Sequence, residues 1–177
     1  MRKMITKILL VVWGILFFIT EIPAQETKIS TISIREFSTN PWEFEPSKDL
    51  FLQYLGDILK SEQFAIKNKL NPSQKDTIIR LFRGRSEIFL YKPYNNKAQL
   101  INANILDKKI ILKGGICVGM SKQEMYKRIA YPETSDDTLT ISLPDGKYKT
   151  KIICRENKIW QIKIEAQNNK LNPDQKI

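Results

Sequence analysis

Residues 113–132, KGGICVGMSKQEMYKRIAYP, combine closely spaced glycines, a cysteine and the pattern of a short helix. A phosphate-binding loop requires the spacing Gly-x-x-x-x-Gly-Lys-Ser/Thr, in which lysine directly follows the second glycine. Gly114 and Gly119 have the glycine spacing, but Met120 stands where the lysine is required. We therefore interpret this stretch as a structural joint between a strand and a helix, and not as an active site.

The start of this helix is marked by Ser121 and Glu124, which have the spacing of a capping box. Met120 and Met125 flank the box at the two positions of a hydrophobic staple. Pro132 cannot continue a helix because proline has no amide hydrogen. The sequence therefore predicts a short helix that begins after Ser121 and ends before Pro132.

Alternating apolar residues after this helix predict a three-stranded antiparallel meander. The expected strands and turns follow one another in the order 138–143, 144–147, 148–155, 156–157 and 158–165. Gly146 is expected to provide a positive φ in the first turn. In the last strand the two-residue period predicts that Trp160, Ile162 and Ile164 share one face.

The run GICVGMSKQEMYKRI with its later proline, followed by CRENKIWQIKI, resembles part of two kinds of small exported domain. These are the SmpA/OmlA-type domains and the β-lactamase-inhibitor-protein-like (BLIP-like) domains. The resemblance covers about residues 110–165, and its carriers are Gly119, Ser121, Glu124, Met125 and Pro132. It implies a fold of helices and antiparallel sheet that binds other proteins in the cell envelope or outside the cell.

The chain before residue 113 has a similar order of patterns. Apolar residues at helical spacing follow Ser47 and predict a helix over 47–60. Strand patterns are found on both sides of this helix, over 27–37, 75–82, 86–91, 98–106 and 110–112.

The fold class expected from these elements is α+β, a mostly antiparallel sheet with helices packed on one face. Each half enters its helix through a Ser-Lys pair and continues into a meander of strands. This common order predicts two α-βββ repeats, over 27–106 and 107–166, within a single domain over 25–166. Residues 167–177 read as a polar tail.

The first 24 residues have the layout of a secretory signal peptide. A basic start at Arg2 and Lys3 precedes the apolar run 8–19, and cleavage is expected between Ala24 and Gln25. An uncleaved anchor is disfavoured because a spanning helix needs about 20 apolar residues. We expect an exported protein, periplasmic or extracellular, that is monomeric and has no membrane anchor after cleavage.

The chain contains no histidine, which excludes catalysis by Ser-His-Asp or Cys-His groups and removes the commonest metal ligand. Cys117 and Cys154 are the two cysteines. In an oxidising compartment a disulfide between them is favoured over two separate buried thiols. We expect neither a metal nor a cofactor.

The formal net charge of +10 attracts polyanions in a salt-dependent way. The lysines are scattered along the chain, without a basic run of the kind found in nucleic-acid-binding arms. A solvated basic surface is therefore favoured over a polyanion site, and nucleic acid is not the expected partner.

Trp42 and Phe44 alternate with acidic residues in a segment bounded by Pro41 and Pro46. Such a segment predicts either an exposed contact patch formed by Trp42 and Phe44 or aromatic anchors that hold a long loop to the core. Of the two, anchoring of the loop to the core is favoured, and the contact patch is kept as the functional alternative.

The function favoured by these observations is that of a non-enzymatic binding or adaptor domain that recognises a protein or an envelope component. A first alternative is a hydrolase of cell wall or glycan that uses a pair of carboxylates. A second alternative is a polyanion binder, which requires the lysines to gather on one face.

Overall fold

The computed structural model describes residues 31–57, 59–68, 70–94 and 97–167. Within these residues seven strands form one sheet, and all neighbouring strands are antiparallel. The expected α+β class with an antiparallel sheet is confirmed. The predicted signal peptide and most of the predicted tail lie outside the described residues.

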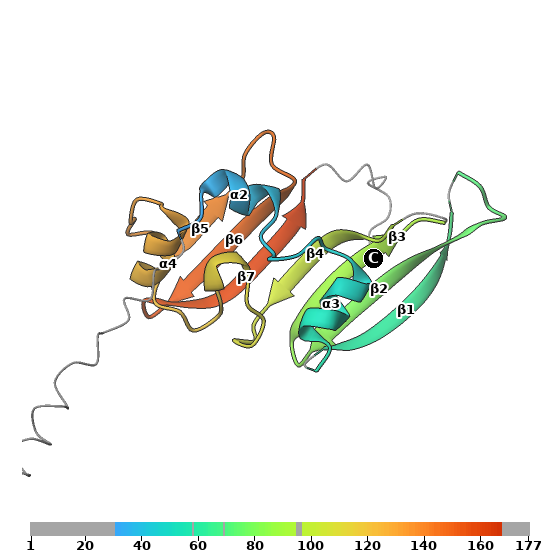
Figure 1. The fold of residues 1–177 in the computed structure, drawn as a ribbon, viewed down its shortest axis with the longest axis horizontal. Coiled ribbons are helices and arrows are strands. Elements are labelled where there is room, and N and C mark those ends of the chain that lie inside the picture. The colour runs from blue at the N-terminus through green and yellow to red at the C-terminus, as the bar shows by residue number, and fades with distance from the viewer. Residues whose placement is uncertain (1–30, 58, 69, 95–96, 168–177) are drawn as a thin grey trace, which may run out of the picture.

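The strands occur in the sheet in the order β1-β2-β3-β4-β7-β6-β5 (Figure 1). In chain order the described elements are α2 (Ile34–Thr39), α3 (Lys48–Leu55), β1 (Lys60–Lys67), β2 (Lys75–Arg83), β3 (Ser86–Lys92), β4 (Gln99–Ile105), the 3-10 helix η1 (Lys113–Gly115), α4 (Lys122–Ile129), β5 (Thr138–Ile141), β6 (Tyr148–Arg155) and β7 (Lys158–Ala166).

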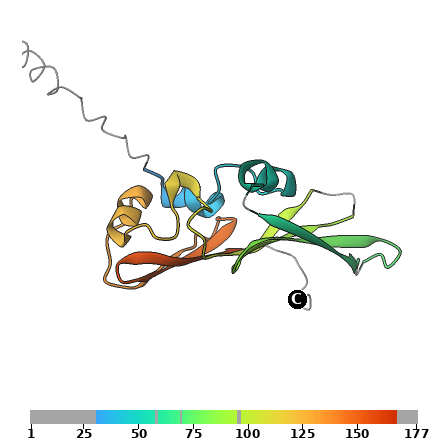
Figure 2. The same ribbon diagram turned by 90° about the horizontal axis from the view of Figure 1, so that it is seen from below.

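All described helices lie on one side of the sheet (Figure 2). Side chains alternate between the two faces of a strand, and one set on each strand is buried beneath the helices. On β2 this set includes Ile79 and Leu81, which pair with Leu90 and Ile88 of β3 and join Phe51 of α3 in the core. No described helix covers the opposite face.

The serine cap predicted at Ser121 is confirmed, and Ser47 caps α3 in the same way. Ser47 Oγ accepts a hydrogen bond from the amide of Leu50 at 3.3 Å, and Ser121 Oγ accepts one from the amide of Glu124 at 3.2 Å. The Glu124 carboxylate does not complete the box; it accepts a hydrogen bond from Arg128 Nε at 2.8 Å. The serine alone therefore caps α4.

The hydrophobic residues around this cap both belong to the core. Met125 is fully buried in α4, and Met120 packs against the core while remaining half-buried. The helix ends at Ile129, and Ala130, which caps it with a left-handed φ of 50°, stands two residues before Pro132. The predicted bounds of this helix are thus confirmed.

The strand predicted over 27–37 is wrong where the structure describes it. Residues 34–39 form α2, and its N-terminus has a complete capping box in which Ser33 and Glu36 each bond to the other's backbone amide. The short strand predicted over 110–112 is also absent from the described elements. Ile110 and Leu112 are buried and Ile111 is exposed, but the chain there turns into η1 instead of pairing with a neighbour.

The helix predicted over 47–60 ends earlier, at Leu55, and Lys60 already begins β1. No strand was expected at β1, because its side chains do not alternate between buried and exposed. Seven of its eight residues are exposed, and only Ile66 is half-buried. Such a strand leaves no periodic signal in the sequence.

Of the two turns in the C-terminal meander, only the second contains residues with a positive φ. Glu156 and Asn157 have φ values of 50° and 57°, as required in the two-residue turn that best fits an antiparallel hairpin. The positive φ expected at Gly146 is wrong. A Cβ at Gly146 would lie 3.1 Å from the side chain of Ser38, so this glycine permits close packing of the turn against α2.

A β-bulge in the β6–β7 hairpin changes which residues of β7 are buried. Ile153 pairs with Gln161, whereas the next residue, Cys154, pairs with Ile159, so Trp160 is an extra residue in β7. Ile159 is buried and Trp160 is only half-buried. The prediction that Trp160 shares the buried face is therefore wrong, because the bulge breaks the two-residue period.

Candidate functional site

The uncovered side of the sheet, which we call the open face, is the most distinctive surface among the described residues. On β2 it is formed by the residues that alternate with the core, including Arg80 and Phe82. Arg80 pairs with Phe89 of β3, and Phe82 pairs with Glu87. On the edge strand β1, Phe64 lies on the same face and is 49% exposed.

Arg80 occupies the centre of an ionic group that crosses three strands. Its guanidinium bonds to Glu62 Oε2 of β1 at 3.0 Å and, through Nε, to Glu87 Oε1 of β3 at 3.0 Å. The guanidinium carbon also lies 4.6 Å from the centroid of the Phe82 ring. The hydrogen bonds to Glu87 and Glu62 raise the pKa of Arg80, and they hold its guanidinium beside the Phe82 ring.

A second aromatic position on the open face is Trp160 of β7. The guanidinium carbon of Arg155 lies 3.7 Å from the centroid of the Trp160 ring, which indicates a cation–π contact. The next residue, Gln161, donates a hydrogen bond to Asn104 Oδ1 of β4 at 2.6 Å. The open face thus continues from the Arg80 group across β4 to the β6–β7 hairpin.

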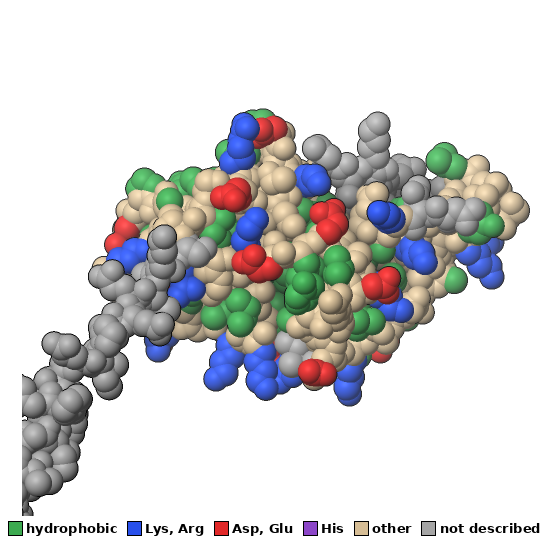
Figure 3. All heavy atoms as spheres, viewed as in Figure 1, with side chains coloured by type: hydrophobic (Ala, Val, Ile, Leu, Met, Phe, Trp, Pro, Cys, Tyr) green, Lys and Arg blue, Asp and Glu red, His purple; other side chains and the backbone are tan. Residues whose placement is uncertain are grey.

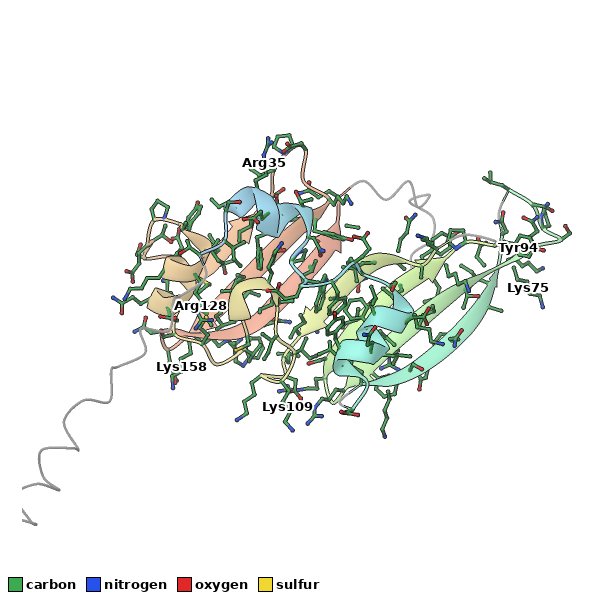
Figure 4. All side chains as sticks on the ribbon, viewed as in Figure 1. Arg35, Lys75, Tyr94, Lys109, Arg128 and Lys158 are labelled. Atoms are coloured by element: carbon green, nitrogen blue, oxygen red, sulfur yellow. The ribbon has the colours of Figure 1, made fainter. Side chains whose placement is uncertain are left out.

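Asp76 lies near the start of β2, at the end of the open face opposite to Phe82, and its side chain is buried, with 1% exposed. Its carboxylate accepts hydrogen bonds from Tyr91 Oη at 2.6 Å, from the Tyr94 amide at 2.8 Å and from Asn68 Nδ2 at 3.0 Å. Figure 4 shows Tyr94 at this end of the sheet, near Lys75. The network holds together the ends of β1, β2 and β3.

Burial acts to raise the pKa of Asp76, but the three hydrogen bonds together outweigh it and hold the pKa below its ordinary value of 3.8. The pKa of Tyr91 is shifted upward. Its burial, its hydrogen bond to Asp76 and the negative charge of that carboxylate raise the pKa of Tyr91 to about 12. The pair is therefore an ionised carboxylate and a neutral phenol at physiological pH.

A cavity of about 300 Å³ opens where β4 and β6 begin and β7 ends. The described residues that line it are Glu45, Pro46, Ala98, Gln99, Leu100, Lys147, Tyr148 and Ala166. Glu45 is the one carboxylate in this set, and hydrolysis of a glycosidic bond by the usual route uses two. Burial and then the charge of Glu45 raise the pKa of Tyr148 to about 12, so its phenol is not a base near neutral pH. This cavity gives no support to the hydrolase alternative.

The contact patch predicted at Trp42 and Phe44 is not an exposed one. Trp42 is fully buried and meets Phe51 edge-on, with ring centroids 4.8 Å apart. Phe44 is half-buried and stacks on Tyr54 at 4.8 Å. The alternative expectation, aromatic anchors that hold the loop to the core, describes both residues. The indole nitrogen of Trp42 has no hydrogen-bond partner among the described residues.

In the glycine-rich stretch, backbone groups of Gly114 and Gly119 form hydrogen bonds to other parts of the protein. The Gly114 amide donates to Glu43 Oε1 at 2.9 Å, and the Gly114 carbonyl accepts from Arg128 Nη1 at 2.9 Å. The Gly119 amide donates to the Ile159 carbonyl at 2.8 Å. These contacts tie the stretch to the loop before α3, to α4 and to β7, as expected of a structural joint.

The disulfide predicted between Cys117 and Cys154 is not formed, and both residues are free thiols. Cys117 is half-buried in the turn before α4, whereas Cys154 is buried within β6. Burial raises the pKa of the Cys154 thiol; nearby Lys122 lowers it and Asp137 raises it. Cys154 is therefore a small core residue rather than a reactive group.

Within the described part of the chain, no group of three or more histidine, cysteine, aspartate or glutamate residues is placed to hold a metal ion. None of the helices in that part is long and apolar enough to span a bilayer. Comparison of the chain with protein-family models, with curated proteins and with solved structures gave no match.

The residues of the open face were not singled out from the sequence. A usable signal was nevertheless present in β2 and β3, where large apolar side chains occupy both alternating sets. Phe82 and Phe89 stand between core positions such as Leu81 and Ile88. A strand with one wet face does not require aromatic residues on that face, so Phe82 and Phe89 were the available sequence signal for an unusually apolar outer face.

Proposed function

We propose that the protein is an exported, non-enzymatic binding domain that recognises another protein through the open face of its sheet. The observation that carries this proposal is the set of aromatic and arginine side chains on a sheet surface that no described helix covers. Its members are Phe64, Arg80, Phe82, Phe89, Tyr91, Arg155 and Trp160.

The composition of this face matches the centre of protein–protein interfaces. Tryptophan, tyrosine and arginine are the residues whose truncation most often costs binding energy. Aromatic side chains on a hydrogen-bonded sheet also lose little conformational freedom when they bind. Arg80 is held in place by Glu62 and Glu87, so its position over Phe82 does not have to be formed on binding.

The proposal extends to the BLIP-like organisation of two α-βββ units. With the expected bounds, the first unit, over 27–106, would contain α3 and β1–β4, and the second, over 107–166, α4 and β5–β7. Both helices have eight residues and a serine N-cap, and the sheet order brings β1 and β5 to opposite edges. The resemblance of residues 110–165 to exported protein-binding domains supports the same function, and residues 1–24 support export.

This function is tested with the mature chain as bait in an envelope extract. The bait carries either no change, the pair Phe82→Ala and Phe89→Ala on the open face, or Tyr54→Ala. Tyr54 lies on α3, on the helix side, and is 60% exposed, so its variant is a matched control. A protein captured by the unchanged bait and by Tyr54→Ala, and lost with the double variant, supports the proposal. Equal capture by all three, or none above an unrelated protein of equal charge, contradicts it.

One observation favours polyanion binding as a second candidate function. The antiparallel order brings the start of β1, β3 and β7 and the end of β2, β4 and β6 to the same side of the sheet. Basic residues are concentrated there, and Figures 3 and 4 show them along one long edge, with Lys109 and Lys158 labelled. Binding to heparin that falls steeply with added salt would support this function, and retention that does not respond to salt would contradict it.

A further inference from the structure

β1 lies at one edge of the sheet and pairs on one side only. All eight of its residues, Lys60–Lys67, pair with β2 in one continuous register. No described segment pairs with its outer side. An edge strand presents a row of backbone amide and carbonyl groups that can bond to another strand.

The middle of β1 lacks the features that usually block such pairing. Its register contains no bulge, its sequence contains no proline, and residues 63–66, Gln-Phe-Ala-Ile, carry no charge. The opposite edge is different, because β5 has only four residues, Thr138–Ile141. One edge of the sheet is therefore short, and the other is long and accessible.

β1 is also held in place before any partner arrives. The Glu62 carboxylate bonds to Arg80 of β2 at 3.0 Å. Just beyond the strand, Asn68 Nδ2 donates to Asp76 of β2 at 3.0 Å. An incoming strand would not have to order β1, which lowers the entropic cost of pairing.

We propose that the outer edge of β1 accepts an extended segment of a partner protein as an additional antiparallel strand. The charges at the two ends of β1, Lys60 and Lys67, select a segment with acidic residues at both ends. The uncharged middle, which includes Phe64 and Ile66, selects apolar or β-branched residues between them. The added strand widens the sheet next to the open face, but it binds through backbone groups and does not require the open face to bind.

A second copy of the chain fits this edge less well. In the antiparallel register that pairs all eight residues with those of another β1, Lys60 lies opposite Lys67 at both ends. Like charges directly opposite each other on neighbouring strands are destabilising. The charge pattern of β1 therefore favours an acidic-ended segment of another protein over self-association.

The test uses the full chain and an eight-residue peptide, equal in length to β1, of alternating valine and threonine with an aspartate at each end. One control peptide has lysines in place of the aspartates, and another has every backbone amide methylated. Binding is followed by amide hydrogen exchange. We expect exchange at residues 60–67 to slow about tenfold with the aspartate peptide. The lysine peptide should bind about fivefold more weakly, and the methylated peptide should not bind.

Two proline variants separate backbone pairing from other contacts. Neighbouring amides in a strand point to opposite sides, so one of Gln63→Pro and Phe64→Pro removes an outward amide and leaves the bonds to β2 intact. That variant should unfold at the same denaturant concentration as the unchanged chain and should lose the peptide. The open-face pair Phe82→Ala and Phe89→Ala should still bind it, which distinguishes this proposal from the proposed function.

Three results would overturn the proposal. The first is unchanged exchange at residues 60–67 with about 1 mM aspartate peptide, a concentration that detects even weak binding. The second is protection on β2 and β3 without protection of β1. The third is a dimer of the unbound chain in which β1 is already protected, because a second copy would then be the occupant.

Discussion

The guanidinium carbon of Arg155 lies 3.7 Å from the ring centroid of Trp160, and exposed Arg155 follows buried Cys154 on β6, so the two side chains of that strand point to opposite faces. The preceding residue, Ile159, is buried on the helix side. The bulge in β7 thus turns the tryptophan outward and leaves the isoleucine to fill the core. Trp160 is therefore only half-buried, and its ring contacts the guanidinium of Arg155.

Substitutions at these neighbouring positions should have very different effects on stability. Ile159→Ala leaves a cavity in the core and should lower the free energy of unfolding by about 2–4 kcal/mol. Trp160→Ala should lower it by about 1 kcal/mol, because it removes mainly an exposed cation–π contact. Urea unfolding of both variants measures the difference. Equal losses would mean that Trp160 is a core residue and not part of an open face.

Substitution of a glycine in the joint should destabilise the protein according to its surroundings. Gly115 has a φ of +72°, and a Cβ there would lie 2.4 Å from Arg128 Nη1. Gly119 has a φ of +91° with nothing within 4 Å of its Cβ position. Each alanine variant should lose about 1–2 kcal/mol through backbone strain. Gly115→Ala should lose more, because it also displaces Arg128 from Gly114. Equal losses in thermal or urea unfolding would contradict this role of Arg128.

The stability of the protein should depend on the ionisation of Asp76 in acid. The pKa of Asp76 is lowered in the folded state from its ordinary value of 3.8. Its contribution is therefore complete above that value and is lost as the pH falls through the lower folded pKa. Asp76→Asn should lower the free energy of unfolding by about 1–3 kcal/mol at neutral pH, because the network loses its charged acceptor.

The difference between the unchanged chain and Asp76→Asn should then shrink as the pH is lowered below 3.8. Urea unfolding at a series of pH values measures it. A difference that stays constant throughout this range would show that the charge of Asp76 does not contribute to stability. The variant Asp145→Asn is a suitable control, because that carboxylate pairs with Arg35 at an exposed position.

The two cysteines should react as separate thiols with a disulfide reagent. Cys117 is half-buried and should react first, whereas Cys154 is 3% exposed, with its pKa raised by burial, and should react only as the protein opens. After unfolding without a reductant, both should be titratable. If no thiol were found in protein purified under oxidising conditions, the free state of these residues would be contradicted.

The predictability of the elements follows from how much of each is buried. Helix α4 and the meander after it were predicted closely, because their burial is periodic and Ser121 marks a clear start. β1 was missed because an exposed edge strand has no buried side to create a period. The sequence before α2 contains the Ser33 and Glu36 spacing of a capping box. A six-residue helix is nevertheless too short to show a helical period, so the alternating apolar residues led to the prediction of a strand.

The candidate site was less predictable than the fold. A single extra residue in β7 moved Trp160 from the expected buried face to the open face, and a two-residue period cannot anticipate a bulge. Trp42 was considered as a contact because it lies in a proline-bounded loop, yet it is a core residue. Which aromatic residue is free to contact a partner depends on the tertiary structure, because the sequence does not show which side of the sheet the helices cover.

Covalent footprinting of the bound complex tests most directly whether the open face binds a protein. The protein, alone and with the partner it captures, is labelled with a reagent that modifies exposed side chains and is then mapped by mass spectrometry. We expect labelling of Phe64, Phe82 and Trp160 to fall on binding, while labelling of Tyr54 on the helix side stays unchanged. Protection of Tyr54 with continued labelling of the open-face residues would contradict binding through the open face.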